Sequence, residues 1–254
     1  MSKHAVLTQE EVKKGKINPK LLQIIQTYAE AHQLEKEAIK ILDWGSGRGQ
    51  TVGALREEGY EAYGVEIDPL PYYNGLPYFQ SKYEKPEEFL QLIDETCLTS
   101  FPDNYFDIIF SEQVLEHVAD LEKVSKEMSR ITKEGGKHLH RFPAKWHLIE
   151  DHLYMPAIHW LPKNLLRFGL IYFCVLIGAE PNWPQLSQSK KREKAKTYYQ
   201  YSIKKTYYRS ITSIKNTFLN NCFNFDYKVN YQRKGKKDIK GYFPKSVEIY
   251  LEKQ

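Results

Sequence analysis

The sequence predicts an α/β fold built around a nucleotide-binding βαβ unit. An apolar run, Ile39–Leu42, is typical of a buried parallel strand, and a glycine-rich turn and a helical segment to about Glu58 follow it. A second short strand, Ala62–Ile67, ends in two acidic residues, Glu66 and Asp68. Strand, glycine turn, helix, strand and acid follow one another in the order found in nucleotide-binding units.

The glycine turn reads Asp-Trp-Gly-Ser-Gly-Arg-Gly from Asp43 to Gly49. Glycines let the backbone approach a ligand that a Cβ would hold off, and the following helix start offers free N–H groups. An acid after the second strand can accept hydrogen bonds from ribose hydroxyls. The dinucleotide fingerprint spaces its glycines by two and then three residues, whereas the spacing here is two and two. This difference argues against a nicotinamide oxidoreductase.

The arrangement D-x-G-x-G-x-G resembles motif I of the class I S-adenosylmethionine-dependent methyltransferases. The resemblance implies that S-adenosylmethionine is the cofactor, with its methionine end beside the glycine turn. It also implies that Glu66 binds the ribose and that Ile67 packs on the adenine. The residues that it places on the methionine side are Asp43, Gly45, Ser46, Gly47 and Gly49.

A second signature, FPDNYFDIIFSEQVLEHV from Phe101, closely resembles a stretch of the ubiquinone/menaquinone-biosynthesis type of methyltransferase (type 11/23 domain). Its apolar part, Asp107–Phe110, predicts a buried fourth strand, so Ser111 begins the loop where ligands sit in open α/β sheets. The family implies that Ser111 lies near the methyl group. It also places an adenine-binding acid near Asp94 or Glu95; we favour Glu95, with Thr96 beside it, although the family usually has Gly-Asp-Ala there.

Hydrophobic spacing and turn residues predict the other elements. The turn-rich aromatic stretch after Asp68 either lines a cleft or packs beside a helix. The predicted helices are Lys20–Gln33, Pro86–Ile93, Leu121–Thr132 (stopped by Glu134–Gly136) and Ser210–Asn221, and the predicted later strands are Lys137–Phe142, Phe223–Tyr231 and Tyr242–Leu251.

The resemblance completes the expected fold class, a Rossmann-like, seven-stranded, mainly parallel sheet with helices on both faces and a helical insertion or lid before the last strands. We expect one methyltransferase domain over residues 1–254. Its parts are a cofactor-binding core (39–143), a substrate-side insertion or lid (144–209), and a closing helix and strands (210–254).

The segment that follows the fifth strand, PAKWHLIEDHLYMPAIHWLP, concentrates histidines with a carboxylate. A histidine near the cofactor methyl could act as the general base that an oxygen nucleophile requires. The candidate catalytic residues are His147 and His152 in this segment and His117 after the fourth strand. Structural hydrogen bonding within a lid is the alternative. No metal is expected, because His147, Glu150 and His152 match no zinc motif.

The most apolar segment, Asn164–Ala179, has Arg167 inside it. It is shorter than the roughly 20 residues that a transmembrane helix needs. A buried helix or a lid over an apolar substrate is the favoured interpretation, and peripheral contact with a membrane is the alternative.

Charge is divided unevenly along the chain. Residues 187–254 hold 17 Lys or Arg against 5 Asp or Glu, whereas residues 1–186 hold 20 against 27. The basic part either meets an anionic partner or is a solvated surface. Its interleaved tyrosines and lysines could stack nucleobases, but no RNA-binding signature accompanies them.

The chain has 254 residues, three widely spaced cysteines and no apolar segment of the signal-peptide kind at its start. These features favour a reducing compartment, the cytoplasm. The predicted function is methyl transfer to a small-molecule or lipid-like acceptor, most simply at oxygen with a histidine base. The alternatives are a nucleic-acid methyltransferase and a non-catalytic protein that retains the fold. The acceptor and the oligomeric state stay open.

Overall fold

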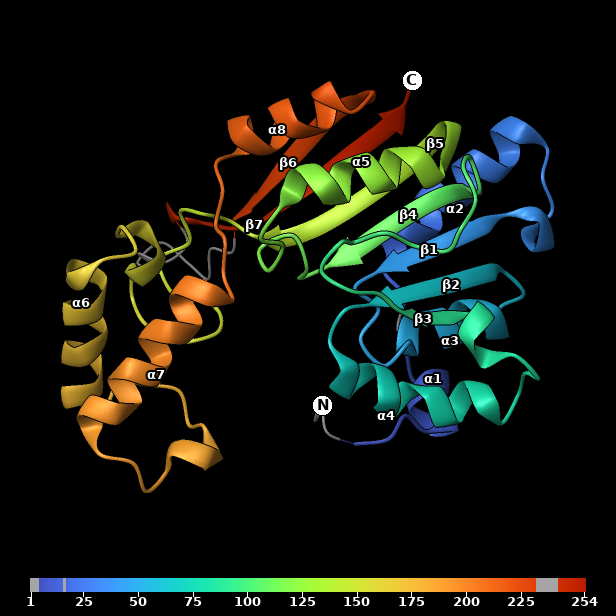
Figure 1. Cartoon of the computed structure of the whole chain (residues 1–254). Helices are drawn as coiled ribbons and strands as arrows, with labels where there is room; N and C mark the ends of the chain where they lie inside the picture. The colour runs from blue at the N-terminus through green and yellow to red at the C-terminus, as the bar shows by residue number, and fades with distance from the viewer. Residues whose placement is uncertain (1–4, 16, 232–241) are drawn as a thin grey trace.

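A seven-stranded β-sheet forms the frame of the computed structural model, which describes residues 5–15, 17–231 and 242–254 (Figure 1). The strands lie in the order β3-β2-β1-β4-β5-β7-β6. Their bounds are β1 (Lys40–Trp44), β2 (Glu61–Glu66), β3 (Leu90–Leu92), β4 (Phe106–Glu112), β5 (Thr132–Pro143), β6 (Phe223–Tyr231) and β7 (Pro244–Lys253). Strands β1 to β5 pair in parallel, and β7 runs antiparallel to both β5 and β6. The predicted fold class is confirmed.

Helices cover both faces of this sheet. Their bounds are α1 (Gln9–Lys13), α2 (Pro19–His32), α3 (Gln50–Glu57), α4 (Pro69–Gln80), α5 (Leu121–Ile131) and α8 (Ile211–Asn220). On one face, Leu21 and Ile25 of α2 share a buried cluster with Ile41 of β1. On the other face, Met128 of α5 and Phe218 of α8 belong to a second cluster. Because strand side chains alternate between faces, the sheet separates two cores.

The βαβ unit is present as the sequence predicts it, with β1, α3 and β2 in that order. The predicted helix over residues 20–33 is α2. The Asn18 side chain caps it by accepting a hydrogen bond from the Lys20 N–H at 3.0 Å. Pro19 occupies the first turn, where a missing N–H loses no helical bond.

The aromatic stretch after Asp68 is a helix, α4, and the prediction of a turn-rich segment is wrong. The Asp68 side chain caps α4 by accepting from the Leu70 N–H at 3.1 Å. Tyr72, Tyr78 and Phe79 are buried in the same core as α2. Of the two roles considered for these aromatic side chains, the structure therefore assigns packing.

The helix predicted for Pro86–Ile93 is also wrong. One 3₁₀ turn, Pro86–Glu88, leads directly into β3 at the edge of the sheet. The Gly64 N–H of β2 donates to the Phe89 carbonyl at 2.8 Å. Pairing with β2 satisfies backbone groups here that a helix would have satisfied internally.

Helix α5 ends at Ile131, and β5 begins immediately at Thr132 rather than at Lys137 as predicted. Thr132 pairs with Phe106 of β4 before the register shifts. The glycines that were expected to stop the helix therefore lie within the strand.

Between β5 and α8 the chain leaves the sheet and forms a small helical lobe from α6 (Leu165–Leu176) and α7 (Lys191–Lys204) (Figure 1). Ile171 and Cys174 of α6 pack against Tyr198 of α7 in a separate apolar cluster. The segment 164–179 does contain a helix, but the expectation of a fully buried one is wrong, because Phe173 and the other outward side chains of α6 are exposed. A lid over an apolar substrate stays a prediction. Within the described ranges, no helix combines the length and the apolar composition that crossing a membrane requires.

Candidate active site

Backbone hydrogen bonds hold the glycine turn after β1 against the end of β2. The N–H groups of Gly45 and Ser46 both donate to the Val65 carbonyl, at 2.8 and 2.9 Å. The Gly47 N–H donates to Oε2 of Glu66 at 2.7 Å. The turn and the acid that the sequence paired as a nucleotide site are therefore in direct contact.

The glycines of the turn serve different purposes. A Cβ on Gly49 would lie 2.7 Å from the ring of Phe79, so this glycine is required for packing. Gly47 has a φ of 58°, and a Cβ built there would have no atom within 4 Å. The backbone of Gly47 thus borders open space, where a ligand can approach it closely.

The carboxylate of Glu66 is buried and held by three backbone N–H groups. Besides the bond from Gly47, its Oε1 accepts from Ile67 and Asp68, both at 2.8 Å. Each carboxylate oxygen has about two acceptor positions, so Oε2 keeps one for a further donor. A ribose hydroxyl is a donor of the right kind.

Asp43 lies near the end of β1 and is buried. Burial raises the pKa of Asp43 well above its usual value, and the nearby charges of Glu112 and Glu66 act in the same direction. These influences disfavour a second negative charge beside Glu66.

The residues expected at the adenine lie around the same edge. Ile67 directly follows Glu66 and is half exposed. Asp94 accepts a hydrogen bond from the Thr96 N–H at 2.8 Å, and bonds from Thr96 lower the pKa of Asp94. Glu95 is exposed on this turn. Asp94 already accepts a hydrogen bond within the turn, and Glu95 is exposed, so the turn is compatible with Glu95 as the adenine-binding acid.

Ser111 is at the expected end of β4, but its hydroxyl faces the interior. Its Oγ lies 2.8 Å from Nδ1 of His140, the residue paired with it on β5. His140 in turn contacts His138, ring nitrogen to ring nitrogen, at 3.2 Å. Burial lowers the pKa of His140 to about 3, so the ring is neutral. A contact between Ser111 and a cofactor would have to come from its backbone.

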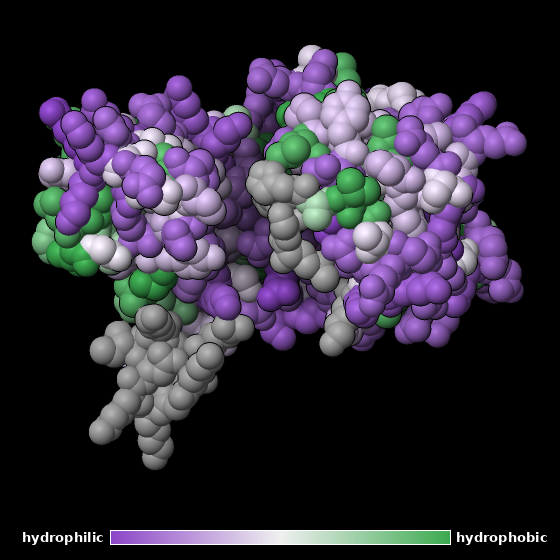
Figure 2. All heavy atoms as spheres, turned by 90° about the horizontal axis from the view of Figure 1, so that it is seen from below, coloured by the Kyte–Doolittle hydropathy of each residue, from purple (hydrophilic) through white to green (hydrophobic). Residues whose placement is uncertain are grey.

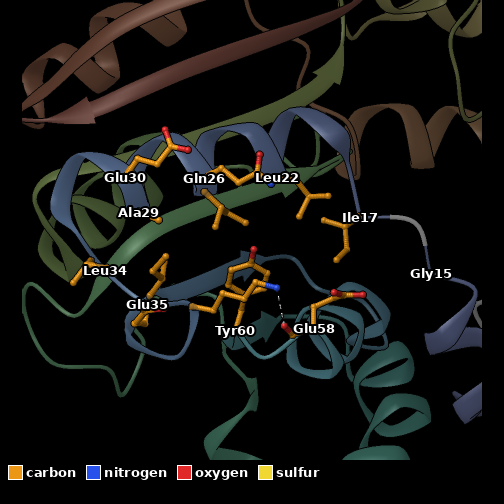
Figure 3. A pocket seen from close by; sticks show the side chains of 13 residues that line it. Gly15, Ile17, Leu22, Gln26, Ala29, Glu30, Leu34, Glu35, Glu58 and Tyr60 are labelled. Atoms are coloured by element: carbon orange, nitrogen blue, oxygen red, sulfur yellow. Dashed lines mark hydrogen bonds between the residues drawn. The ribbon is translucent and has the colours of Figure 1, made fainter.

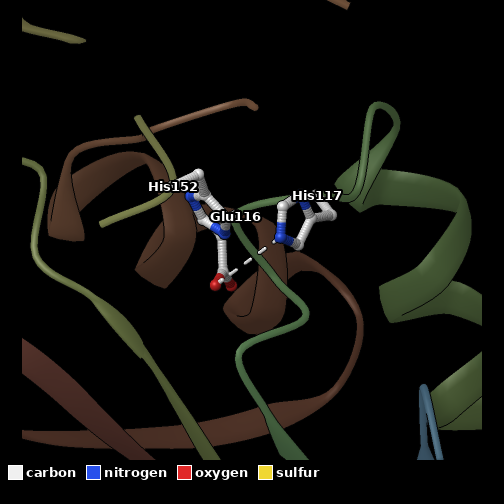
Figure 4. Close-up of side chains that lie close together, drawn as sticks. All are labelled: Glu116, His117 and His152. Carbon is white, nitrogen blue, oxygen red and sulfur yellow. Dashed lines mark ion pairs between the residues drawn. The ribbon is translucent and has the colours of Figure 1, made fainter. Parts of the chain in front are cut away.

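Two of the three candidate catalytic histidines lie together. The ring centroids of His117 and His152 are 4.6 Å apart (Figure 4). Nδ1 of His117 lies 2.6 Å from the Lys205 carbonyl, and Nδ1 of His152 lies 2.8 Å from Oε1 of Glu150. Tyr208 donates to the same Glu150 oxygen at 2.8 Å. The insertion thus brings His152 to the loop after β4.

Glu150 and His152 each shift the pKa of the other toward the charged form. Burial alone would raise the pKa of Glu150, but the hydrogen bond and charge of His152, together with hydrogen bonds from Leu153 and Tyr208, outweigh burial and lower this pKa. Burial alone would lower the pKa of His152, but the bond and charge of Glu150, with the charges of Glu116 and Asp151, raise it. His152 is therefore a stronger base than an ordinary histidine side chain.

His147 does not join this pair. Its Nδ1 lies 3.4 Å from Asp151. Its backbone carbonyl accepts a hydrogen bond from the Trp160 indole at 3.0 Å. Of the three candidate histidines, His147 is the one whose contacts are with nearby residues of its own segment, Asp151 and Trp160.

Glu116 is a site residue that the sequence reasoning missed, although it stands in the V-L-E-H signature. It is 2 % exposed, and within the described part of the chain neither of its carboxylate oxygens has a hydrogen-bond partner. It lines a small cavity with Tyr207 and Tyr208. Burial raises the pKa of Glu116 to about 7. Only the folded structure reveals this burial.

The same cluster has the composition of a cation site. Glu116, His117 and His152 each offer one ligand atom, and these atoms lie within 4.8 Å of one another. Imidazole and carboxylate groups are ligands for divalent metals such as zinc. The sequence prediction of no metal stays a prediction.

A further cavity lies elsewhere in the described part of the chain. It has a volume of about 550 Å³ and is bordered by α2 and by residues before β1 and β2, including Leu22, Glu30 and Tyr60 (Figure 3). These residues lie at the amino ends of the strands, whereas the glycine turn and Glu66 lie at the carboxyl ends. The cavity is therefore separate from the candidate active site.

Comparison with known proteins shows that the central part of the chain is similar to methyltransferases. Residues 42–140 match the family described as "Methyltransferase domain". An uncharacterized methyltransferase of Mycolicibacterium gilvum is 34 % identical over 98 residues, which are 39 % of this chain and 36 % of that protein. The uncharacterized methyltransferase YcgJ of Bacillus subtilis is 30 % identical over 100 residues, 39 % of each chain. The match thus spans less than half the length of these curated relatives.

A solved structure supports the fold over a longer part of the chain. Phosphoethanolamine N-methyltransferase 2 of Haemonchus contortus, in complex with S-adenosyl-L-methionine, has a TM-score of 0.56 at 15 % identity. The similarity covers 92 % of this chain and 52 % of that one. At this identity the comparison speaks for the fold alone.

Proposed function

We propose that this chain is a class I S-adenosylmethionine-dependent methyltransferase, which transfers the methyl group of S-adenosylmethionine to an oxygen atom of a small-molecule or lipid-like acceptor. The match of residues 42–140 to the family described as "Methyltransferase domain" supports the proposal. The observation that carries the cofactor half is the contact between the Gly47 N–H and Glu66. The observation that carries the acceptor half is the Glu150–His152 pair beside His117.

The residues at the carboxyl edge of the sheet fit the cofactor. Open space at Gly47 suits the methionine end, and the remaining acceptor position on Glu66 suits a ribose hydroxyl. Ile67 offers an exposed apolar side chain to the adenine, with Glu95 and Thr96 on the next turn. The bound cofactor supplies an electrophilic methyl group on a sulfonium sulfur.

The acceptor hydroxyl must lose its proton as its oxygen bonds to the methyl carbon. In our proposal, His152 takes this proton on Nε2, while Glu150 holds Nδ1 and stabilises the resulting imidazolium. The new bond is O–CH₃, the S–CH₃ bond breaks, and the sulfur keeps its electron pair in S-adenosylhomocysteine. His117 borders the acceptor, and His147 is the remaining, more distant candidate.

Chain organisation and location belong to the same proposal. We assign residues 39–143 to cofactor binding, 144–209 to the acceptor side and 210–254 to the closing elements of one domain. Cys97, Cys174 and Cys222 are all free, which agrees with a reducing compartment such as the cytoplasm.

The first experiment is calorimetric titration with S-adenosylhomocysteine. Wild type should bind with micromolar affinity, and Glu66→Ala should bind about tenfold or more weakly, because a hydrogen bond to a charged group is lost. Glu58→Ala is the matched control, since Glu58 is an exposed carboxylate near the amino ends of the strands, away from the glycine turn. Absence of binding by wild type would contradict the cofactor assignment.

The second experiment follows an isotope-labelled methyl group into lipid and water-soluble cell extracts. We expect mass spectrometry to find it on an oxygen atom. A label found only on nitrogen or carbon would overturn the oxygen assignment. Label in RNA would favour the nucleic-acid alternative, and no product despite normal cofactor binding would favour a non-catalytic protein.

A further inference from the structure

The outward face of α6 is an unbroken apolar stripe. Leu166, Phe173 and Ile177 are 65 %, 56 % and 62 % exposed, and their spacing places them on one side of the helix. Leu165 and Leu176 extend this surface, and Gly169 between them borders open space. Monomeric soluble proteins rarely expose contiguous apolar surface of this kind unless it contacts a partner or a membrane.

The one charge of this helix points the other way. Arg167 is buried, and its guanidinium donates to the carbonyls of Leu161 and Ser202. These bonds tie α6 to α7 and leave the outer face without a charged side chain. The helix is therefore apolar on both sides: Ile171 and Cys174 pack against the lobe, and the outer face is apolar as well, whereas an ordinary surface helix is polar on its outer face.

The lobe that carries the stripe is strongly basic. Residues 161–209 contain ten Lys or Arg and two Glu. Lys191 lies beside the stripe, because its Nζ donates to the Leu176 carbonyl at 2.9 Å. Lys190, Arg192 and Lys196 are exposed on the adjoining α7. Figure 2 shows apolar residues along the outer edge of this lobe, bordered by hydrophilic ones.

From these observations we infer that the outer face of α6 is a peripheral membrane-binding surface for anionic bilayers. Leu166, Phe173 and Ile177 enter the boundary between headgroups and acyl chains, and the lysines and Arg192 contact anionic headgroups. Pairing of two copies through this face would bring two basic lobes together, and their charges would repel. A helix of 12 residues lies along the surface, since a span needs roughly 20.

The lobe that carries the docking surface is linked to the acceptor side of the candidate active site. The chain after α7 reaches the loop after β4, where the Tyr207 N–H donates to the Glu116 carbonyl at 2.6 Å. Arg209 donates to the Val118 carbonyl at 2.7 Å. A bilayer held by α6 would therefore lie on the side of the molecule that supplies His152.

Vesicle co-sedimentation tests the inference without cofactor or acceptor, so its result is independent of the proposed methyl transfer. We would compare vesicles of phosphatidylcholine alone with vesicles that also contain the anionic lipid phosphatidylglycerol. Wild type should bind the anionic vesicles and release them at high salt. The Phe173→Glu/Ile177→Glu variant should bind at least tenfold more weakly, as should Lys191→Glu/Arg192→Glu.

Leu219→Glu is the matched control, because Leu219 is a half-exposed leucine on α8 and should not alter vesicle binding. Unchanged S-adenosylhomocysteine binding or an unchanged thermal transition shows that each variant is folded. Wild type that stays in the supernatant with both vesicles would overturn the inference. A concentration-dependent dimer that Phe173→Glu dissolves would also overturn it, by assigning the stripe to a second copy.

Discussion

Nδ1 of His152 lies 2.8 Å from Oε1 of Glu150, across an interval of two residues in the chain. The carboxylate holds the ring in one orientation through Nδ1, so Nε2 is the nitrogen that would accept a proton in the proposed mechanism. Because Glu150 is buried and its oxygens also accept from Tyr208 and from backbone N–H groups, the pair is held from several sides. This relationship distinguishes His152 from the other histidines of the insertion.

Replacing the proposed base gives the first prediction. His152→Ala should lower kcat by about 10²–10⁴-fold, the usual contribution of a general base, while S-adenosylhomocysteine binding stays unchanged. His147→Ala is the control and should lower kcat by far less, because His147 contacts Asp151 rather than Glu150. Steady-state kinetics with the identified acceptor measure both. Equal losses in the two variants would remove the reason to prefer His152.

The pH dependence follows from the same pair. A base must be neutral to accept a proton, so activity should fall as pH decreases through the pKa of His152. Since Glu150 and its neighbours raise this pKa above 6.5, the acidic limb should lie above pH 6.5. In Glu150→Gln the main raising influence is lost, so the limb should move to lower pH. A limb that stays in place would show that another group titrates.

Local signals were sufficient to predict the βαβ unit that carries the proposed cofactor site. The glycine turn, the helix after it and the acid after β2 lie within 30 residues, and each is a short-range pattern with one physical reason. By contrast, β3 is three residues long and too short for an alternating pattern. The prolines of α4 suggested a turn-rich segment and so hid the helix from sequence reasoning. The helix forms nevertheless, because Pro69 lies in the first turn, where proline is tolerated, and Asp68 supplies the cap.

The acceptor side depended on contacts between distant residues. The composition of the insertion drew attention to His147 and His152 equally, and only the fold brings His152 to His117. The Ser111–His140 contact depends on the register of β4 against β5, which no local pattern determines. Burial of Glu116 likewise depends on Tyr207 and Tyr208, more than 90 residues further along.

The glycine turn yields a prediction that separates binding from stability. Gly47→Ala meets no atom, so its cost to folding should be limited to about 1–2 kcal/mol for the left-handed backbone. Gly49→Ala adds a contact of 2.7 Å with Phe79 in the core and should be destabilised by about 1–3 kcal/mol more. Urea unfolding measures both values. In calorimetry, folded Gly47→Ala should bind S-adenosylhomocysteine at least tenfold more weakly; wild-type affinity would place the cofactor elsewhere.

The last prediction concerns the cluster of Glu116, His117 and His152. His152 can accept a proton on Nε2 only where no cation occupies that nitrogen, so a histidine-base mechanism predicts full activity after dialysis against EDTA. Elemental analysis of the purified protein should find no stoichiometric metal. Glu116→Gln keeps the shape of the buried side chain, whose pKa of about 7 allows a neutral form, and should retain most of the activity. Activity that is lost with EDTA, restored by zinc or manganese and absent in Glu116→Gln would instead make these three residues metal ligands, with the metal polarising the acceptor oxygen.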